Sequence, residues 1–475
     1  MFKKVFQIFL FYPLYFLQLE NYQLKRFWRA YLKKAFTLKK PRQKLVLTNK
    51  IFVLLFLSFF IIFLLNFKIF INYSPIIIFL TLILSLFFFP LILNISVIVL
   101  MPLDWLIKNL IIFKAKRKIQ KFKNLKIIGI TGSYGKTSFK EILATILSVK
   151  YKVVFTPENK NTPLGISNVI LKNLNENTEI FVVEMSAWQK GDIKTLCQIT
   201  PPDIALITGI NESHLERFKT IENTIKTKFE IVKYSKPNAL IVLNADNNLI
   251  VENYKNYLGN KQVIFYGKEN TSFLNYKITN IIFEEERFKQ KCTIEFEKEK
   301  KEIEIPLLGD YAISTIIGAF LIAKHLGLND KDIKLGISLI KPIAHRLEPI
   351  KKENFLIIDD SYNGNPNGAK AAIEVLKKFK NKRKIYVTPG LVEMGKEAQK
   401  VHEEIGRLLA PVADLVILIQ NSVTGFIISG LLEKNFNREK IIIFNNPLEL
   451  QEKIKEIIKP NDVILFQNDW PDNYF

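Results

Sequence analysis

One short stretch of the sequence combines the residue types that bind a nucleotide phosphate. Residues 131–138 read TGSYGKTS, and they follow the apolar run 126–130 and precede a helix-like pattern over residues 139–149. A glycine-rich loop between a strand and a helix points backbone N–H groups at an anion, and the helix N-terminus adds its positive dipole. Lys136 is expected to reach the β- and γ-phosphates, and Thr137 is expected to bind Mg²⁺ through its hydroxyl. The residues expected at the nucleotide are Thr131, Gly132, Ser133, Tyr134, Gly135, Lys136, Thr137 and Ser138.

This loop fits one of two common phosphate-loop patterns. The longer pattern, G-x-x-x-x-G-K-[ST], requires glycine at position 130, where this chain has Ile130, but the shorter T-G-x-x-G-K-T fits residues 131–137 in full. The alternative without function is a glycine turn followed by a lysine at the start of a helix. The strand-like and helix-like segments on either side favour the phosphate loop.

One acid after the loop is a candidate for holding a metal ion, and two other positions are weaker signals when they are taken alone. Glu184 ends the apolar run 180–183, and an acid at the carboxyl end of a strand can face a phosphate loop and bind Mg²⁺. His214 follows the apolar run 204–207, although an isolated histidine more often has a structural role. Lys228 lies with Glu230 in a helix-like stretch, and the two alone are typical of a solvated face.

The elements that position these residues begin after Lys126. From there strand-like and helix-like segments alternate, which predicts an α/β layered fold. The two cysteines, Cys197 and Cys292, have no metal-ligand spacing and offer no disulfide framework. The body is therefore expected to lie in the cytoplasm.

Residues 1–126 differ from the rest of the chain in charge and hydropathy. Of the formal net charge of +23, +19 falls in this part, where 21 Lys/Arg stand against two acids. The apolar runs 51–65 and 75–103 predict a transmembrane helical hairpin over residues 51–103, and the first run reaches about 20 residues only if 66–71 join it. A buried core hairpin is the alternative. The positive charge therefore indicates a membrane surface rather than a nucleic acid.

The flanks of the two runs predict the orientation of the hairpin. Basic clusters stand before and after the runs, in a basic, interfacial segment over residues 1–50 and a basic linker over residues 104–125, whereas the connector has Lys68 alone. The positive-inside rule then places both flanks in the cytoplasm. Met1–Leu19 is similar to a signal peptide but lacks a small-residue cleavage site, so an interfacial helix or a retained segment is expected.

In their order along the chain, the segments after Lys126 resemble the Mur ligase family, the ATP-dependent amide ligases of peptidoglycan synthesis. The resemblance covers roughly residues 126–466. Apart from the phosphate loop, it rests on segments similar to the family's substrate-facing, metal-binding, strand-end, hinge and nucleotide-contacting segments, namely 159–165, 183–193, 211–216, 228–231, 243–246, 345–348, 359–366 and 390–395 with His402. The last two are most like those of the members that add D-alanyl-D-alanine.

The resemblance implies a fold class and a reaction. It implies an α/β protein with a P-loop-type central ATPase domain, residues 126–340, and a C-terminal Rossmann-like α/β domain, residues 341–475, preceded by the transmembrane hairpin. A carboxylate would attack the γ-phosphate of ATP, and an amine would then displace phosphate from the acyl phosphate. Because the carboxylate and the phosphate are both anionic, positioning and charge neutralisation should dominate catalysis.

The resemblance also implies a role for each site residue. Thr137 and Glu184 would hold one Mg²⁺, and His214 with a carbamylated Lys228 would hold a second. Arg346 would contact an ATP phosphate once the C-terminal domain closes. The expected cofactors are thus ATP and two Mg²⁺. The expected catalytic residues are Lys136, His214, Lys228 and Arg346, and the C-terminal residues expected at the nucleotide are Arg346, Asp360, Asn363 and Asn365.

Three departures from the family pattern bear on the substrate. Residues 1–125 leave no room for the family's UDP-sugar-binding domain, so a lipid-linked muramoyl peptide is expected as an acceptor beside a small-molecule one. The block G-x-H-N-x-x-N near the adenine ring reads GDYAIST, with Tyr311, Ala312 and Thr315 at the replaced positions, and Tyr311 could stack on the base. The Lys-Gly-Ser segment of the D-alanyl-D-alanine-adding members is replaced by residues 466–474.

Two alternatives to this function stay open. One is a ligase that acts on a different lipid-linked or polymer peptide, and the other is a non-catalytic ATP-binding scaffold at the membrane. The complete metal-binding set argues against the scaffold. The protein is expected in the inner membrane as a multi-pass protein, with membrane lipid as a partner and with an amino acid or dipeptide as the amine. A nucleic-acid partner is not expected, because the basic residues flank apolar runs.

Overall fold

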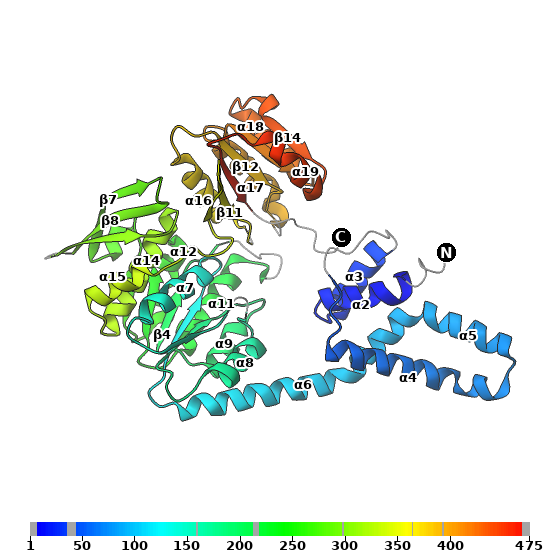
Figure 1. Cartoon of the computed structure of the whole chain (residues 1–475). Helices are drawn as coiled ribbons and strands as arrows, with labels where there is room; N and C mark the ends of the chain where they lie inside the picture. Colours follow the sequence, from blue (N-terminus) through cyan, green and yellow to red (C-terminus); the bar gives the residue numbers. More distant parts are fainter. Residues whose placement is uncertain are drawn as a thin grey trace. The chain divides into compact units, whose positions relative to one another are not determined.

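The computed structural model describes two compact units, one within Met1–Leu110 and the other within Ile111–Pro471 (Figure 1). The description covers residues 7–35, 44–157, 160–211, 218–296, 299–362, 364–391 and 394–467.

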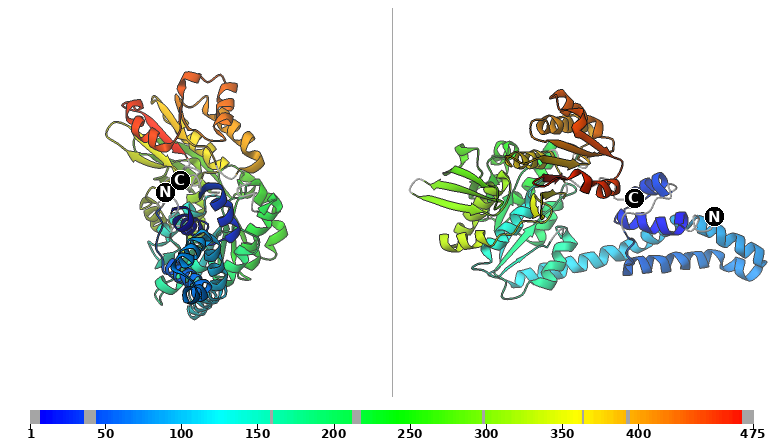
Figure 2. Two further views of the ribbon diagram at one scale, coloured as in Figure 1. Left: turned by 90° about the vertical axis from the view of Figure 1, so that its right-hand side faces the viewer. Right: turned by 45° about the horizontal axis from the view of Figure 1, so that its top comes forward.

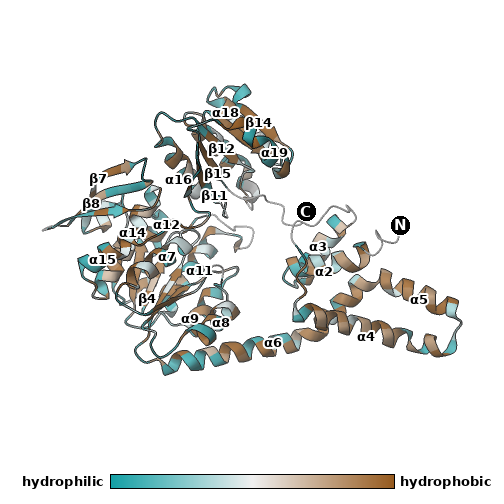
Figure 3. Ribbon diagram, in the orientation of Figure 1, coloured by the Kyte–Doolittle hydropathy of each residue, from teal (hydrophilic) through white to brown (hydrophobic). Residues whose placement is uncertain are grey.

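Two helices that begin in the first unit are long and apolar enough to cross a membrane. These are α4 (Asn49–Asn72) and α6 (Phe89–Lys121), and α5 (Pro75–Phe87) stands between them. Figure 3 shows apolar residues all along α4 and α5 and along the first half of α6. Three side-chain contacts order the helices antiparallel, namely Lys50 Nζ to Asp104 Oδ2 at 2.7 Å, Ser58 Oγ to Ser96 Oγ at 2.9 Å and Asn66 Nδ2 to Ser85 Oγ at 3.0 Å.

The sequence predicted one helix over the second apolar run, but the structure has two. It breaks at Phe88, and Pro90 follows at the start of α6. A proline inside the run would lack the N–H for the next hydrogen bond, and its ring would clash with the carbonyl of Leu86 four residues earlier. The return arm of the hairpin is therefore built from α5 and the first half of α6.

The N-terminal residues fold onto the same unit. A π-helical turn (Gln7–Phe11) leads into α2 (Tyr12–Leu19), and α3 (Leu24–Lys34) follows. Phe16 and Phe27 are fully buried in a core that they share with Leu54 of α4 and Leu93 of α6. The side chain of Gln18 also exchanges two hydrogen bonds with the backbone of Val46. The described part of the predicted interfacial segment is thus packed against the apolar helices.

The second unit contains a parallel sheet that confirms the predicted α/β fold. Its six strands are arranged in the order β2-β3-β1-β4-β5-β6. They are β1 (Lys126–Thr131), β2 (Val153–Phe155), β3 (Ile180–Glu184), β4 (Ile204–Ile207), β5 (Leu240–Asn244) and β6 (Val263–Tyr266). These runs are rich in Ile, Val and Leu without polar alternation, as expected for parallel strands that are covered on both faces.

Helices cover both faces of this sheet. One core joins alternate strand residues such as Ile128 and Ile130 to α7 (Lys136–Leu147), α14 (Asp310–His325) and α15 (Asp330–Ser338). The opposite core joins Ile127 to the end of α6, to α8 (Pro163–Asn173) and α9 (Asp192–Ile199), and to α11 (Ile221–Tyr234), α12 (Asn248–Asn253) and α13 (Lys255–Leu258). The carboxyl ends of the strands therefore open between two helical layers, where parallel α/β sheets bind ligands.

A small antiparallel sheet adjoins α14 and α15 (Figure 2). It consists of β7 (Tyr276–Glu284), β8 (Lys289–Phe296) and β9 (Lys300–Ile305), and a 3₁₀ turn (Thr271–Phe273) precedes it. The sequence offered no motif in this region.

The C-terminal part of the chain forms a second α/β layer. Its strand order is β10-β11-β15-β12-β13-β14, in which only β10 is antiparallel to its neighbour. The strands are β10 (Glu348–Lys351), β11 (Leu356–Asp360), β12 (Lys384–Thr388), β13 (Leu415–Ile419), β14 (Ile441–Phe444) and β15 (Val463–Gln467). The helices are α16 (Pro366–Lys377), α17 (Ala398–Leu409), α18 (Thr424–Glu433) and α19 (Pro447–Ile457), with 3₁₀ turns at Gly395–Glu397 and Arg438–Lys440. The two predicted α/β bodies are thus present, and the exact domain boundaries stay predictions.

Candidate active site

The predicted phosphate loop connects β1 to α7 at the carboxyl edge of the central sheet. Gly135 caps α7 in a left-handed conformation, with φ of 75°. The end of β4 supports the loop, because Ser133 N donates to Gly209 O at 2.7 Å. A Cβ on Gly209 would lie 2.2 Å from the ring of Tyr134, so a larger residue at this position would have to displace that ring. The N-terminus of α7 is left facing the space where a phosphate would bind.

Two side chains of the loop, those of Lys136 and Thr131, make hydrogen bonds to backbone carbonyl groups. Lys136 Nζ donates to Gly132 O at 2.9 Å. Burial lowers the pKa of Lys136, while the charge of Glu184 opposes that shift and Arg346 adds to it. Thr131 is fully buried, and its hydroxyl donates to Met185 O at 2.8 Å. The Thr131 side chain thus braces the loop against the segment after β3.

Glu184 lies beside the phosphate loop at the end of β3, as its position in the sequence predicted. Its side chain is 3% exposed. Oε2 accepts from Thr137 Oγ1 at 2.9 Å, and Oε1 accepts from Asn161 Nδ2 at 3.1 Å. A hydroxyl and a carboxylate at this distance are oxygen ligands of the kind that Mg²⁺ takes. Thr137 and Glu184 therefore fit a magnesium ion.

Lys228 is buried, which corrects the expectation that Lys228 and Glu230 form a solvated face. The two residues are 4% and 9% exposed on the inner side of α11. Desolvation lowers the pKa of Lys228 to about 7, with a further lowering by Lys136 and opposing contributions from Asp192 and Glu230. Glu230 in turn accepts from Gly191 N at 2.9 Å and fixes the segment that follows β3. A lysine of this pKa is largely an uncharged amine above neutral pH.

Two predicted residues cannot be placed. His214 and Asn363 lie outside the described residues, so the second metal site is represented by Lys228 alone.

Next to the phosphate loop is a cavity of about 290 Å³ between the central and C-terminal bodies. The phosphate loop contributes Tyr134, Gly135 and Ser138 to its wall, and α14 contributes Tyr311, Ser314 and Thr315. From the C-terminal body come Arg346, Asp360 and Asn365. The structure therefore brings together residues that are more than two hundred positions apart in the sequence, as expected for a nucleotide site that both bodies complete.

The C-terminal residues are oriented by local contacts. The Arg346 guanidinium lies over the Tyr362 ring at 4.6 Å. Burial raises the pKa of Asp360 to about 7, although its carboxylate accepts from Leu347 N at 3.3 Å and lies near Arg346. Asn365 is the N-cap of α16, where Oδ1 accepts from Gly368 N at 3.1 Å. The N-terminus of a second helix thus borders the cavity.

Aromatic side chains form much of the cavity wall. Besides Tyr311, the lining includes Phe139, Tyr266 and Tyr362, of which Phe139 and Tyr266 contact each other edge-on at 5.4 Å. Thr315 Oγ1 donates to Tyr311 O at 2.8 Å, and Ala312 is fully buried. At these three positions the chain therefore has no side-chain amide to offer to a base.

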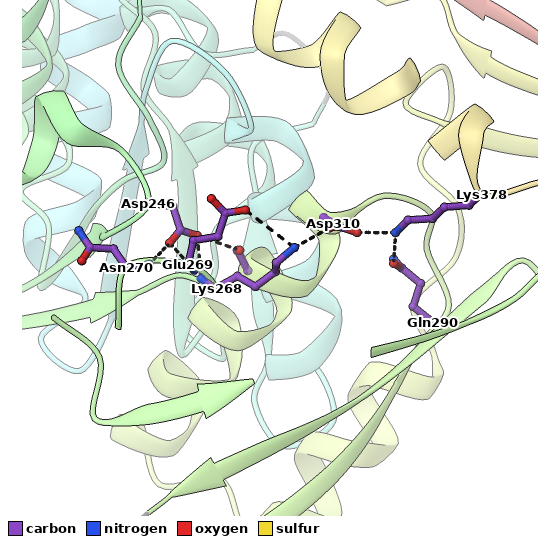
Figure 4. Close-up of polar contacts among 8 residues, drawn as sticks. Asp246, Lys268, Glu269, Asn270, Gln290, Asp310 and Lys378 are labelled. Atoms are coloured by element: carbon purple, nitrogen blue, oxygen red, sulfur yellow. Dashed lines mark hydrogen bonds and ion pairs between the residues drawn. The ribbon is translucent and has the colours of Figure 1, made fainter. Parts of the chain in front are cut away.

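A charged network at the rim of the cavity was missed by the sequence reasoning (Figure 4). The Asp310 carboxylate pairs with Lys268, which follows β6, and with Lys378, the C-cap of α16. Lys378 also donates to Gln290 Oε1 of β8 at 3.4 Å. Burial raises the pKa of Asp310, but the hydrogen bonds from the two lysines outweigh it and lower the pKa overall. One carboxylate thus joins the central and C-terminal bodies.

Models of two protein domains match the chain. The Mur ligase middle domain matches residues 130–323, and the Mur ligase glutamate ligase domain matches residues 345–467.

The chain is also similar in sequence to individual ligases. The UDP-N-acetylmuramoyl-tripeptide--D-alanyl-D-alanine ligase of Bacillus subtilis is 29% identical over 354 residues, which cover 72% of each chain. The ligase of the same name from Escherichia coli is 30% identical over 282 residues, or 59% of this chain and 61% of that one.

Solved structures share the fold. MurF ligase from Thermotoga maritima in complex with ADP has a TM-score of 0.66 at 28% identity, covering 76% of this chain and 80% of that one. MurF from Acinetobacter baumannii has a TM-score of 0.67 at 22% identity, covering 76% and 77%, which shows the fold alone.

Proposed function

This chain belongs to the Mur ligase family, and on that premise we propose that it uses ATP to join D-alanyl-D-alanine to the carboxylate of a muramoyl tripeptide in peptidoglycan synthesis. The observation that carries the proposal is the constellation at the edge of the central sheet. There Lys136, Thr137 and Glu184 lie beside a cavity that Arg346 and Asp360 close from the C-terminal body.

Different residues would have different roles in the first step, the formation of the acyl phosphate. Backbone N–H groups of the phosphate loop and the start of α7 would bind the phosphates of ATP. Lys136 and Arg346 would neutralise charge as the substrate carboxylate attacks the γ-phosphate and forms an acyl phosphate. The aromatic cavity beside the loop would hold the base and position the nucleotide, with Tyr311 available for stacking. The amine then displaces phosphate and forms the amide bond.

Two Mg²⁺ ions would complete the site. Thr137 and Glu184 would hold one Mg²⁺, and Lys228 with His214 would hold a second. Bound Mg²⁺ would offset the negative charge that gathers on the transferred phosphoryl group. Carbamylation would convert Lys228 from an amine into an anionic oxygen ligand: its Nζ attacks CO₂, forms an N–C bond and releases one proton. The lowered pKa of Lys228 supports this role, because only the uncharged amine reacts.

The choice of acceptor depends on whether the protein is anchored in a membrane. We infer that α4 and the paired helices α5 and α6 anchor the protein in the inner membrane, with the catalytic body in the cytoplasm. An anchored ligase has access to a lipid-linked muramoyl tripeptide as well as to a UDP-linked one. The test must distinguish this function from the two alternatives, which are a ligase for another peptide and a non-catalytic ATP-binding scaffold.

The test compares these acceptors with one protein preparation. Full-length protein in detergent receives ATP, Mg²⁺ and D-alanyl-D-alanine with UDP-linked or lipid-linked muramoyl tripeptide, and phosphate release is measured. Phosphate release that needs both acceptor and amine supports the ligase, and faster release with the lipid-linked acceptor supports the anchored form. Equal activity of a hairpin-deleted protein on the UDP-linked acceptor would count against a lipid-linked substrate. Lys136→Ala should abolish turnover while the protein stays folded, and normal turnover in the folded variant would refute the assigned site.

A further inference from the structure

One buried lysine near the candidate metal site has no part in the reaction described above. Lys140 lies on α7, one helical turn after Lys136, and its side chain is 0% exposed. A fully buried lysine is rare in folded proteins unless it is paired, because removing an ammonium group from water is costly. The position of Lys140 therefore calls for a partner that is equally buried.

The partner is Glu184. Lys140 Nζ lies 3.5 Å from Glu184 Oε2, and the Glu184 side chain is 3% exposed. The second carboxylate near Lys140 is that of its neighbour Glu141, at 3.3 Å, but this side chain is 33% exposed and can be solvated. Lys140 also lies 5.9 Å from the centre of the Phe155 ring, so an apolar wall faces the pair.

Three side chains from two segments thus hold the Glu184 carboxylate. Thr137 and Lys140 of α7 contact Oε2, and Asn161, which precedes α8, contacts Oε1. Thr137 is expected to turn toward a bound metal, and Lys136 Nζ is expected to reach the phosphates. Among the residues that the structure describes, Lys140 is a cation beside Glu184 to which the proposed reaction assigns no such second task.

We propose that Lys140 is a positioning residue, which holds the Glu184 carboxylate in the orientation that a magnesium ion requires. The proposal rests on the proposed function, because it assigns a support to one of its metal ligands. Groups that orient a metal ligand typically change metal affinity or activity by about 10- to 100-fold when they are removed. The effect of Lys140 should therefore depend on Glu184.

A double-mutant cycle tests that dependence. Lys140→Met should lower kcat by about 10- to 100-fold and raise the Mg²⁺ concentration for half-maximal rate, with the KM for ATP at saturating Mg²⁺ changed by less than about threefold. In a Glu184→Gln background, Lys140→Met should lower kcat by less than about threefold further, because the carboxylate that Lys140 positions is no longer present. Equal losses in both backgrounds, in folded proteins, would mean that Lys140 is only structural.

Two further variants and one binding measurement complete the test. Glu141→Gln removes the other carboxylate beside Lys140 and should change kcat by less than about threefold. If Lys140→Met fails to fold, Lys140→Gln keeps a hydrogen-bond donor and should give an intermediate loss, whereas full activity of that variant together with wild-type metal binding would overturn the proposal. Electron paramagnetic resonance of Mn²⁺, with a non-hydrolysable ATP analogue, should show weaker binding by folded Lys140→Met.

These outcomes are separate from those of the proposed function. Wild-type protein that binds Mn²⁺ and nucleotide but joins none of the acceptors refutes the proposed reaction alone. Wild-type activity with unchanged Mn²⁺ binding in folded Lys140→Met refutes the positioning role alone.

Discussion

The proposed carbamylation of Lys228 by carbon dioxide has a pH dependence that can be tested. An ordinary lysine has a pKa of 10.5, and burial lowers that of Lys228 to about 7. The difference disfavours the ammonium form by roughly 5 kcal/mol. At pH 7 about half of the Lys228 side chains are then uncharged, compared with about one in three thousand for an ordinary lysine.

The direction of the pH dependence follows from this shift. Only the uncharged amine reacts with CO₂, so formation of the carbamate is favoured above pH 7 and suppressed below it. Between pH 6 and pH 8 the uncharged fraction rises from about 10% to about 90%. When CO₂ is limiting, we therefore expect ligase activity to rise about ninefold over this range, and added bicarbonate should restore most of the loss at the lower pH.

The assay measures phosphate release after incubation in CO₂-free buffer at pH 6 and at pH 8, before and after addition of bicarbonate. Lys228→Met should lose at least about 99% of the activity and should not respond to bicarbonate. Lys226→Met is the matched control, because Lys226 lies two residues away on the exposed side of α11. The reasoning is refuted if bicarbonate has no effect on the wild-type protein, or if Lys228→Met stays active.

Three other predictions follow from the structure. Asp360 has a pKa raised from 3.8 to about 7, so the folded protein loses stability as the pH rises from about 4 to about 7, and the loss is complete above that range. Asp360→Asn should therefore raise the unfolding temperature more at pH 8 than at pH 5, where only part of the loss has accumulated, and the reverse order would contradict the shift. Lys378→Met should raise the KM for ATP by up to about fivefold through loss of the Asp310 contact, whereas Lys377→Met on the same helix should not, and equal kinetics of the two variants would remove the network's role. Phe379→Ala should destabilise the C-terminal body by about 3–5 kcal/mol, because Phe379 is fully buried against Phe283, and an unchanged thermal unfolding transition would contradict that packing.

Features that are continuous in the sequence were the ones that could be predicted. The phosphate loop could be recognised because its glycines, Lys136 and Thr137 stand in one stretch between a strand and a helix. Glu184 could be assigned because it ends a strand, and the carboxyl ends of parallel strands share one edge. The apolar runs likewise predicted long apolar helices, which are present as α4 and α6, although Pro90 divides the second run.

Features that arise from packing could not be predicted. A lysine and a glutamate two positions apart on a helix are usually exposed, and only the placement of α11 against the segment after β3 buries Lys228 and Glu230. The Asp310 network joins residues 42 and 68 positions apart, with no pattern that links them. The sequence alone does not distinguish Lys140 from other helical lysines, because its burial results from the packing of α7 beside Glu184.

The central claim is that this protein forms an amide bond at the expense of ATP. Its most direct test is mass spectrometry of the product after incubation of full-length protein with ATP, Mg²⁺, D-alanyl-D-alanine and a muramoyl tripeptide, with phosphate measured in the same sample. The account predicts a muramoyl pentapeptide and phosphate in equal amounts, and neither with Lys136→Ala. Phosphate release without a new amide, or a pentapeptide formed without ATP, would contradict it.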